Sequence, residues 1–155
     1  MSNDFDYTVV TRALIKAIKD GTGYQLIEAN SPGEQPEYPF CTFTITSPSI
    51  QIERYYEGAL FEMVVSLTWH GTSQIGVLNL AKKTESYLRS DAGRKTLADN
   101  GIALVDITGI SSRDNFISID YERTIGFDVR LLAKDTFTDD SVDTIQSFKV
   151  NQYGG

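Results

Sequence analysis

The side chains that could act as acids, bases or nucleophiles in this sequence are few, and the single histidine, His70, is the first of them. A catalytic histidine needs a nucleophile and an orienting carboxylate, and no motif around His70 supplies both. It falls on the polar side of a predicted strand end, next to Gly71. We therefore predict a solvated histidine, and one histidine is too few for a histidine-based metal centre.

Four carboxylates could meet across a predicted β-hairpin, namely Asp106, Asp120, Glu122 and Asp128. Paired acids catalyse glycoside hydrolysis, and clustered carboxylates bind hard cations. Glu122 and Asp128, however, share one side of a strand with Arg130, so cross-strand ion pairing is the simpler interpretation. A hydrolase that uses these acids stays the alternative to a structural role.

The other candidate sites lack a complete signature. Cys41 is the only cysteine and falls on the apolar side of a strand, which predicts a buried, unreactive thiol. Gly21-Thr22-Gly23 lacks the third glycine of a dinucleotide-binding loop. An acidic group without calcium-loop spacing follows later in the chain: Asp135, Asp139, Asp140 and Asp143. No catalytic residue, metal site or cofactor is predicted, and a small-ligand site around Trp69 and Tyr87 is the weakest alternative.

Length and charge limit the remaining classes of protein. A chain of 155 residues is long enough for one domain with its own core. The net charge of −7 disfavours a nucleic-acid reader, and the longest basic run is Lys82-Lys83. No apolar run approaches the roughly 18 residues of a membrane helix, and no secretory signal is visible. A single cysteine suits assembly in a reducing cytoplasm.

The polar candidates must be positioned by regular elements, and the first of these is a helix over residues 6–20. Its apolar side chains recur at helical spacing and form a stripe for the core: Val10, Ala13, Leu14, Ala17 and Ile18. The basic residues lie away from this stripe: Arg12, Lys16 and Lys19. Asp6 or Asp4 can cap the start of the helix, and Gly21 suits the left-handed position at its end.

A second helix is predicted to start at a cap on Thr72 or Ser73 and to run to Ser90. Residues 91–100 add another turn or two. Strands are predicted mostly from alternation of apolar and polar residues, over residues 24–29, 40–46, 59–69, 102–110 and 121–133. The segment 109–115 is polar and is predicted to be the turn of the last hairpin.

This order of elements predicts an α+β fold in which a mostly antiparallel twisted sheet has two main helices packed on one face. We expect a single domain over residues 1–155. Pro48 is predicted to end the first long strand, and the proline-rich segment 30–39 to form an extended loop. Residues 135–155 are either an edge strand or a flexible C-terminal arm.

Four segments, Tyr38–Pro48, Gly101–Ile110, Arg113-Asp114 and Tyr121–Leu131, resemble the neck or tail terminator proteins of tailed bacteriophages. With the order helix, strands, helix, hairpin, the likeness covers most of residues 5–134. The resemblance implies a structural virion protein of a phage or prophage, not an enzyme, assembled in the host cytoplasm. Such a subunit forms a ring, commonly a hexamer, on the head-proximal end of the tail. The ring stops tail polymerisation and provides the head-joining surface.

The partners that this resemblance implies are further copies of the chain, a tail-tube protein and a head-completion or connector protein. DNA only passes through the lumen, and an acidic subunit suits that role because like charge disfavours contact with phosphates. No membrane is involved. Another virion part built on a similar sheet, such as a tail-tube or head–tail connector subunit, is the close alternative.

A ring needs heterologous contacts, in which one surface of a subunit meets a different surface of the next. Exposed aromatic and arginine side chains are the usual anchors of such contacts. The candidates for the subunit interface lie at the hairpin tip, at a bend before the second long strand and in the late polar loop: Arg113, Asp114, Phe116, Tyr55, Tyr56 and Phe137.

Overall fold

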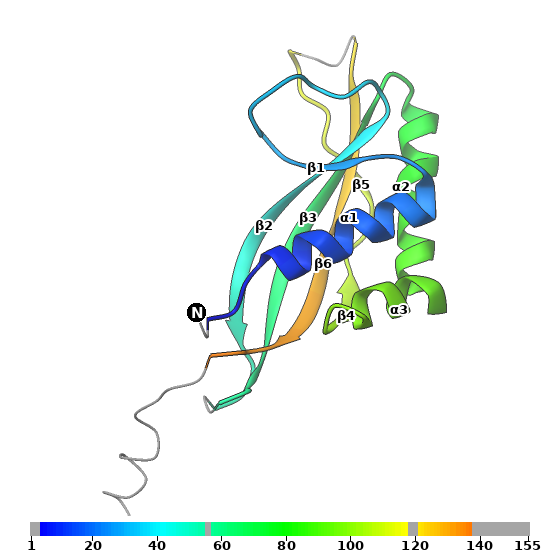
Figure 1. The fold of residues 1–155 in the computed structure, drawn as a ribbon. Coiled ribbons are helices and arrows are strands. Elements are labelled where there is room, and N and C mark those ends of the chain that lie inside the picture. Colours follow the sequence, from blue (N-terminus) through cyan, green and yellow to red (C-terminus); the bar gives the residue numbers. More distant parts are fainter. Residues whose placement is uncertain (1–3, 55–56, 118–120, 138–155) are drawn as a thin grey trace, which may run out of the picture.

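The computed structural model describes residues 4–54, 57–117 and 121–137, which form a sheet with helices on one side (Figure 1). The helices are α1 (Thr8–Thr22), α2 (Gln74–Arg89) and α3 (Asp91–Ala98). The strands are β1 (Leu26–Glu28), β2 (Phe40–Gln51), β3 (Leu60–Gly71), β4 (Ile102–Ile107), β5 (Ser111–Ser112) and β6 (Arg123–Lys134). The strand order is β1-β2-β3-β6-β4, with β5 also paired to β6. Only the β1–β2 pair is parallel among these described strands, which confirms the predicted α+β fold.

The centre of the sheet is the β3–β6 pair, which stays in register from Leu60↔Lys134 to Gly71↔Arg123. Alternate side chains of both strands are buried against the helices: Met63, Val65, Leu67, Trp69, Ile125, Phe127, Val129, Leu131 and Ala133. The predicted alternation is confirmed there, and each large apolar side chain so buried contributes about 1.5–3 kcal/mol. Tyr121 precedes the strand and is exposed, so the predicted dry face does not extend to it.

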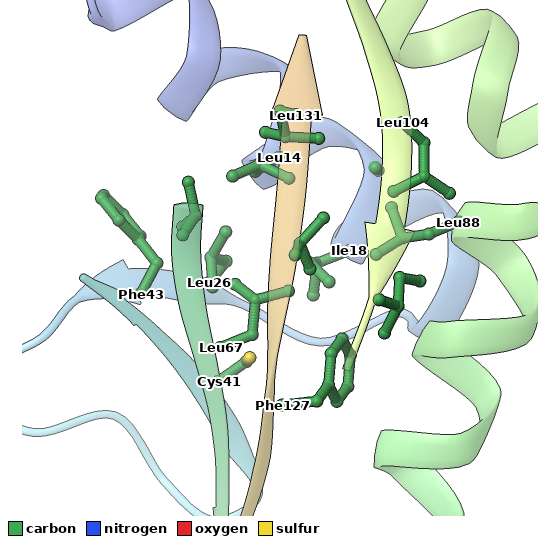
Figure 2. Close-up of a cluster of buried hydrophobic side chains, with 14 of the residues drawn as sticks. Leu14, Ile18, Leu26, Cys41, Phe43, Leu67, Leu88, Leu104, Phe127 and Leu131 are labelled. Carbon is green, nitrogen blue, oxygen red and sulfur yellow. The ribbon is translucent and has the colours of Figure 1, made fainter. Parts of the chain in front are cut away.

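The two predicted helical stripes supply the other half of the core. Figure 2 shows Leu14 and Ile18 of α1 and Leu88 of α2 among the sheet residues Leu67 and Phe127. The cap on α2 is Ser73, whose hydroxyl accepts a hydrogen bond from the Gly76 N–H at 3.1 Å. Helix and sheet periodicities therefore converge on a single buried layer.

The end of α1 differs from the prediction. The left-handed residue is Gly23, with φ +82°, and its N–H donates to the Lys19 carbonyl. Gly21 instead lies inside α1 against the Tyr87 ring, where an added Cβ would be 2.6 Å from two ring carbons. It is a glycine because α2 approaches closely, not because the chain reverses there. The N-cap residue is Tyr7, which makes no side-chain cap bond, and the predicted cap Asp6 lies one residue earlier, where it accepts a hydrogen bond from the Thr8 N–H at 3.0 Å.

Pro48 does not end β2, which continues to Gln51 with register shifts on either side of Ser47. β1 pairs only with the segment Cys41–Phe43, so among the residues that the structure describes no strand lies beside the outer edge of β2 at Pro48. A proline is tolerated at such an edge because no partner needs its missing N–H. The Pro48 carbonyl accepts a hydrogen bond from the Tyr7 hydroxyl at 2.7 Å.

The predicted turn at 109–115 is also corrected, because β5 lies within it. Ser111 and Ser112 pair with Gly126 and Ile125, so the chain turns toward β6 only after them. Of the predicted C-terminal strand or arm, only Asp135–Phe137 lie in the described part of the chain, as loop. Among all the residues that the structure describes, no helix is long and apolar enough to cross a membrane.

Candidate assembly surface

Arg113 was expected at the exposed hairpin tip, but its side chain lies along the polar face of the sheet. Its Nη1 donates to the Ser66 and Thr68 hydroxyls of β3, and its Nη2 lies 3.2 Å from Asp128 Oδ1 of β6. Gly126 makes room for the guanidinium, since a Cβ there would be 2.8 Å from Arg113 Nε. Arg113 therefore fixes the segment after β5 onto the central strands.

Asp114 anchors the same segment on its other side. Arg123 Nε donates to Asp114 Oδ2 at 3.0 Å, and the Thr124 N–H donates to Oδ1 at 2.8 Å. Ser112 donates a third hydrogen bond, to Oδ2. The Arg123 and Thr124 bonds hold the pKa of Asp114 below its ordinary value, so this carboxylate is charged throughout the neutral range. Like Arg113, Asp114 stabilises the base of the hairpin loop, next to the start of β6, and does not lie at the tip of the loop.

Beyond this base the chain exposes an apolar tip, which we define as Phe116 and Ile117. Phe116 is 97% exposed and Ile117 is 86% exposed. Asn115 shapes the turn before them, because its Oδ1 accepts the Ile117 N–H at 2.9 Å. Two adjacent large apolar side chains this open to water are typical of a contact surface, since single exposed apolar residues are common and adjacent bare ones are not. The tip is the strongest exposed apolar feature of the described chain.

The remaining predicted contact residues divide into two cases. Phe137 is exposed and follows Asp135, whose N–H donates to the Ala59 carbonyl. Both residues come after the Lys134 end of β6, whereas the tip comes before its Arg123 end. Tyr55 and Tyr56 lie outside the described residues. The contact roles of all six residues stay predictions.

His70 is not a solvated histidine, and that prediction is wrong. Its side chain is 19% exposed, and its ring stacks on Phe40 with centroids 4.8 Å apart. Nε2 lies 3.0 Å from the Thr42 hydroxyl, and Nδ1 lies 3.4 Å from Glu122 Oε2 without hydrogen-bond geometry. Burial lowers the pKa of His70 more than Glu122 raises it, so the ring is neutral at pH 7.

His70 lies between the Thr42 hydroxyl and the Glu122 carboxylate. A hydroxyl, an imidazole and a carboxylate in this arrangement could act as a nucleophile, a base and an orienting group. Glu122 also accepts a hydrogen bond from the Tyr38 hydroxyl at 2.9 Å, and the ring of Tyr38 stacks on Phe40. This arrangement ties the β1–β2 loop to the start of β6. The long Glu122 to Nδ1 contact does not orient the ring as a catalytic partner does, so we interpret the cluster as packing.

The acids of the predicted hairpin do not converge. Glu122 is held by Tyr38, whereas Asp128 is held by Arg113. Arg130 pairs with Glu62 of β3 at 2.8 Å and faces Asp106 across the β4–β6 ladder. Asp120 lies outside the described residues. Within the described chain no three His, Cys, Asp or Glu side chains are grouped to hold a metal ion.

Two aromatic candidates and the thiol belong to the core. Trp69 is fully buried, and its Nε1 donates to the Thr84 hydroxyl at 2.9 Å. Tyr87 packs on Gly21. Trp69 is therefore enclosed by the core, and Tyr87 is partly buried against it. Cys41 is fully buried, as predicted, and burial raises the pKa of its thiol well above the ordinary range.

Sequence reasoning did not identify Ile117, Gly126 or the hydroxyls of Ser66 and Thr68, which accept hydrogen bonds from Arg113. Ile117 follows Phe116 directly, and a polar turn interrupted by two adjacent apolar residues was the available signal. Ser66 and Thr68 gave no such signal, because alternation identifies them only as polar-face residues of a strand.

Comparison with known proteins identifies one protein family and a solved structure that match most of the chain. A protein-family model described as "Phage neck terminator protein" matches residues 8–154. One solved structure aligns with 88% of this chain and 99% of its own length, at 12% sequence identity and a TM-score of 0.52, which shows a shared fold. No curated protein matches the sequence significantly.

Proposed function

This chain belongs to the phage neck terminator protein family, and we propose that it forms a homo-oligomeric ring, a hexamer, at the head-proximal end of the tail. There the ring stops polymerisation of the tail tube and provides the surface to which the head joins. Its partners are further copies of itself, the tail-tube protein and a head-completion or connector protein. Membership of this family supports a location in the neck or tail of the virion.

The apolar tip is the observation that carries the self-association. Phe116 and Ile117 are almost fully exposed in the single subunit, so association removes apolar surface from water. Their base is held by Arg113 on one side and Asp114 on the other. A contact element that is already ordered loses less conformational entropy on binding, which favours a defined subunit contact.

A ring built this way also suits the passage of DNA. The net charge of −7 disfavours contact between the subunit and phosphate groups at long range. DNA is therefore a passenger in the lumen and not a specifically bound partner.

Complementation of a phage that lacks this gene tests the function. We expect Phe116→Ser with Ile117→Ser to leave the subunit folded and to abolish its activity in tail completion. Electron micrographs should then show overlong tails without heads, as in the deletion itself. Ile75→Ser removes an exposed apolar side chain from the first turn of α2 instead and should complete tails normally.

Tail morphology also separates the alternative virion roles. A tail-tube subunit gives no tails when it is deleted, whereas a connector subunit gives tails of normal length that fail to join heads. Either phenotype contradicts the terminator function. Normal tail completion by the Phe116 and Ile117 double variant contradicts the role of the apolar tip while leaving the terminator function intact.

A further inference from the structure

The outer face of α1 carries a basic stripe on an acidic protein. Arg12, Lys16 and Lys19 recur at helical spacing around Ile15, and all four side chains are exposed. Together with Thr8 and Thr11 of the first turns and Asp20 near the end of the helix, they line a shallow hollow of about 480 Å³. This face is opposite the stripe that α1 buries in the core, so nothing in the described subunit covers it.

A second segment of the chain carries the opposite charge. Between Lys19 and Arg54 the sequence contains no lysine or arginine. The β1–β2 loop exposes Glu34 and Glu37 in this interval, and neither forms an ion pair within the described residues. Figure 1 shows this loop at the end of the strands near β1, whereas α1 crosses the middle of the sheet. The two charged surfaces are therefore separate regions of one subunit.

We propose that the basic stripe of α1 on one copy binds the acidic β1–β2 loop of the next copy in the ring. This inference rests on the proposed function, because it assigns two surfaces to the contact between neighbouring subunits. A heterologous contact needs two different and mutually complementary surfaces on the same chain, and these two meet that need. Ile15, which is 42% exposed, supplies an apolar centre within the charged rim.

The charges available to a neighbour are chiefly those of Arg12 and Lys19. Lys16 already pairs with Asp20 along the helix at 2.8 Å, which offsets its charge. Copies with a net charge of −7 repel each other at long range, so a local attraction of opposite sign selects one orientation of approach. Such steering weakens as salt is added.

Reversal of each surface in turn provides the test. The first variant is Arg12→Glu with Lys19→Glu, and the second is Glu34→Lys with Glu37→Lys. Each one alone places like charges on both sides of every contact, which should weaken self-association by roughly tenfold or more at low ionic strength. In an equal mixture, the glutamates of one variant meet the lysines of the other, and assembly should return with the two variants alternating. The chain that carries all four substitutions should assemble alone.

Two readouts are used, namely sedimentation of the purified variants and completion of tails by the same variants in the phage. The matched control is Lys82→Glu with Lys83→Glu, which makes the same change in net charge on α2 and should assemble normally. If net charge alone controlled self-association, the result would differ. The second variant is less acidic than the wild type and would assemble more readily than it. Loss of assembly in the control overturns the inference.

Failure of the inference and failure of the proposed function give different results. Normal assembly by either reversed variant alone, or no rescue in the mixture, overturns the α1–loop contact. A deletion that leaves tail length unchanged overturns the terminator function, while rescue in the sedimentation mixture still supports the contact. If the stripe binds DNA instead, a short duplex binds the wild type but not the four-substitution chain, which then fails to complete tails.

Discussion

At the scale of single residues, His70 makes the protein sensitive to mild acid. Burial lowers the pKa of His70 below the unfolded value of about 6.5, so the folded state resists the proton that the unfolded state accepts. The free energy of unfolding should therefore fall as the pH drops below about 6.5 and stop falling below the folded pKa. We expect His70→Gln to remove this dependence, as measured by urea unfolding between pH 7.5 and pH 5 in steps of about half a unit. An unchanged slope in the variant would contradict a buried neutral imidazole.

Asp114 should show the opposite dependence in a more acidic range. Its folded pKa is depressed, so its stabilising effect is present above the unfolded value of about 3.9 and is lost as the pH falls through the folded pKa. Asp114→Asn should cost about 1–2 kcal/mol at pH 7, because charged hydrogen bonds from Arg123 and the Thr124 N–H weaken. The free energies of unfolding of the two proteins should converge as the pH falls through the folded pKa of Asp114. A constant difference down to low pH would show that the carboxylate charge is not responsible.

At the scale of elements, Gly126 in β6 decides whether Arg113 can lie flat on the sheet. A Cβ at this position would be 2.8 Å from Arg113 Nε and 2.9 Å from its Cζ, and would also press on the Leu67 carbonyl. Gly126→Ala should therefore displace the guanidinium and lower stability by about 1–3 kcal/mol. Gly109→Ala is the matched control, because an added Cβ there meets nothing within 4 Å. Thermal unfolding of both variants is the measurement, and equal melting temperatures would contradict the close contact.

The elements that sequence could predict are those whose pattern is local. Alternation predicts the buried sides of β3 and β6, and helical spacing predicts the stripes of α1 and α2, because these periods follow from backbone geometry alone. Gly21 and Pro48 were misassigned because a neighbouring helix and an open sheet edge decide their roles. Arg113 was placed at the tip for the same reason, since its partners Ser66 and Thr68 lie more than 40 residues away in sequence. The exposed Phe116 was identified as a contact candidate, but its anchored base was not.

At the scale of the whole molecule, folding and assembly are predicted to be separable. The core is formed by α1, α2, Leu97 of α3 and the inner face of the sheet, and the apolar tip of Phe116 and Ile117 contributes nothing to it. If copies associate through the tip, association stabilises the folded state, and the melting temperature rises with protein concentration. In the variant with both tip residues changed to serine, the melting temperature should rise less with concentration than in the wild type, because only the contact between α1 and the β1–β2 loop remains. Calorimetry over about a hundredfold range of protein concentration measures these melting temperatures. For a contact of micromolar affinity, association over that range stabilises the folded state by about 2–3 kcal/mol. A wild type whose melting temperature does not change with concentration would mean that the ring assembles only on the tail. A double variant that melts well below the dilute wild type would show that the tip belongs to the fold.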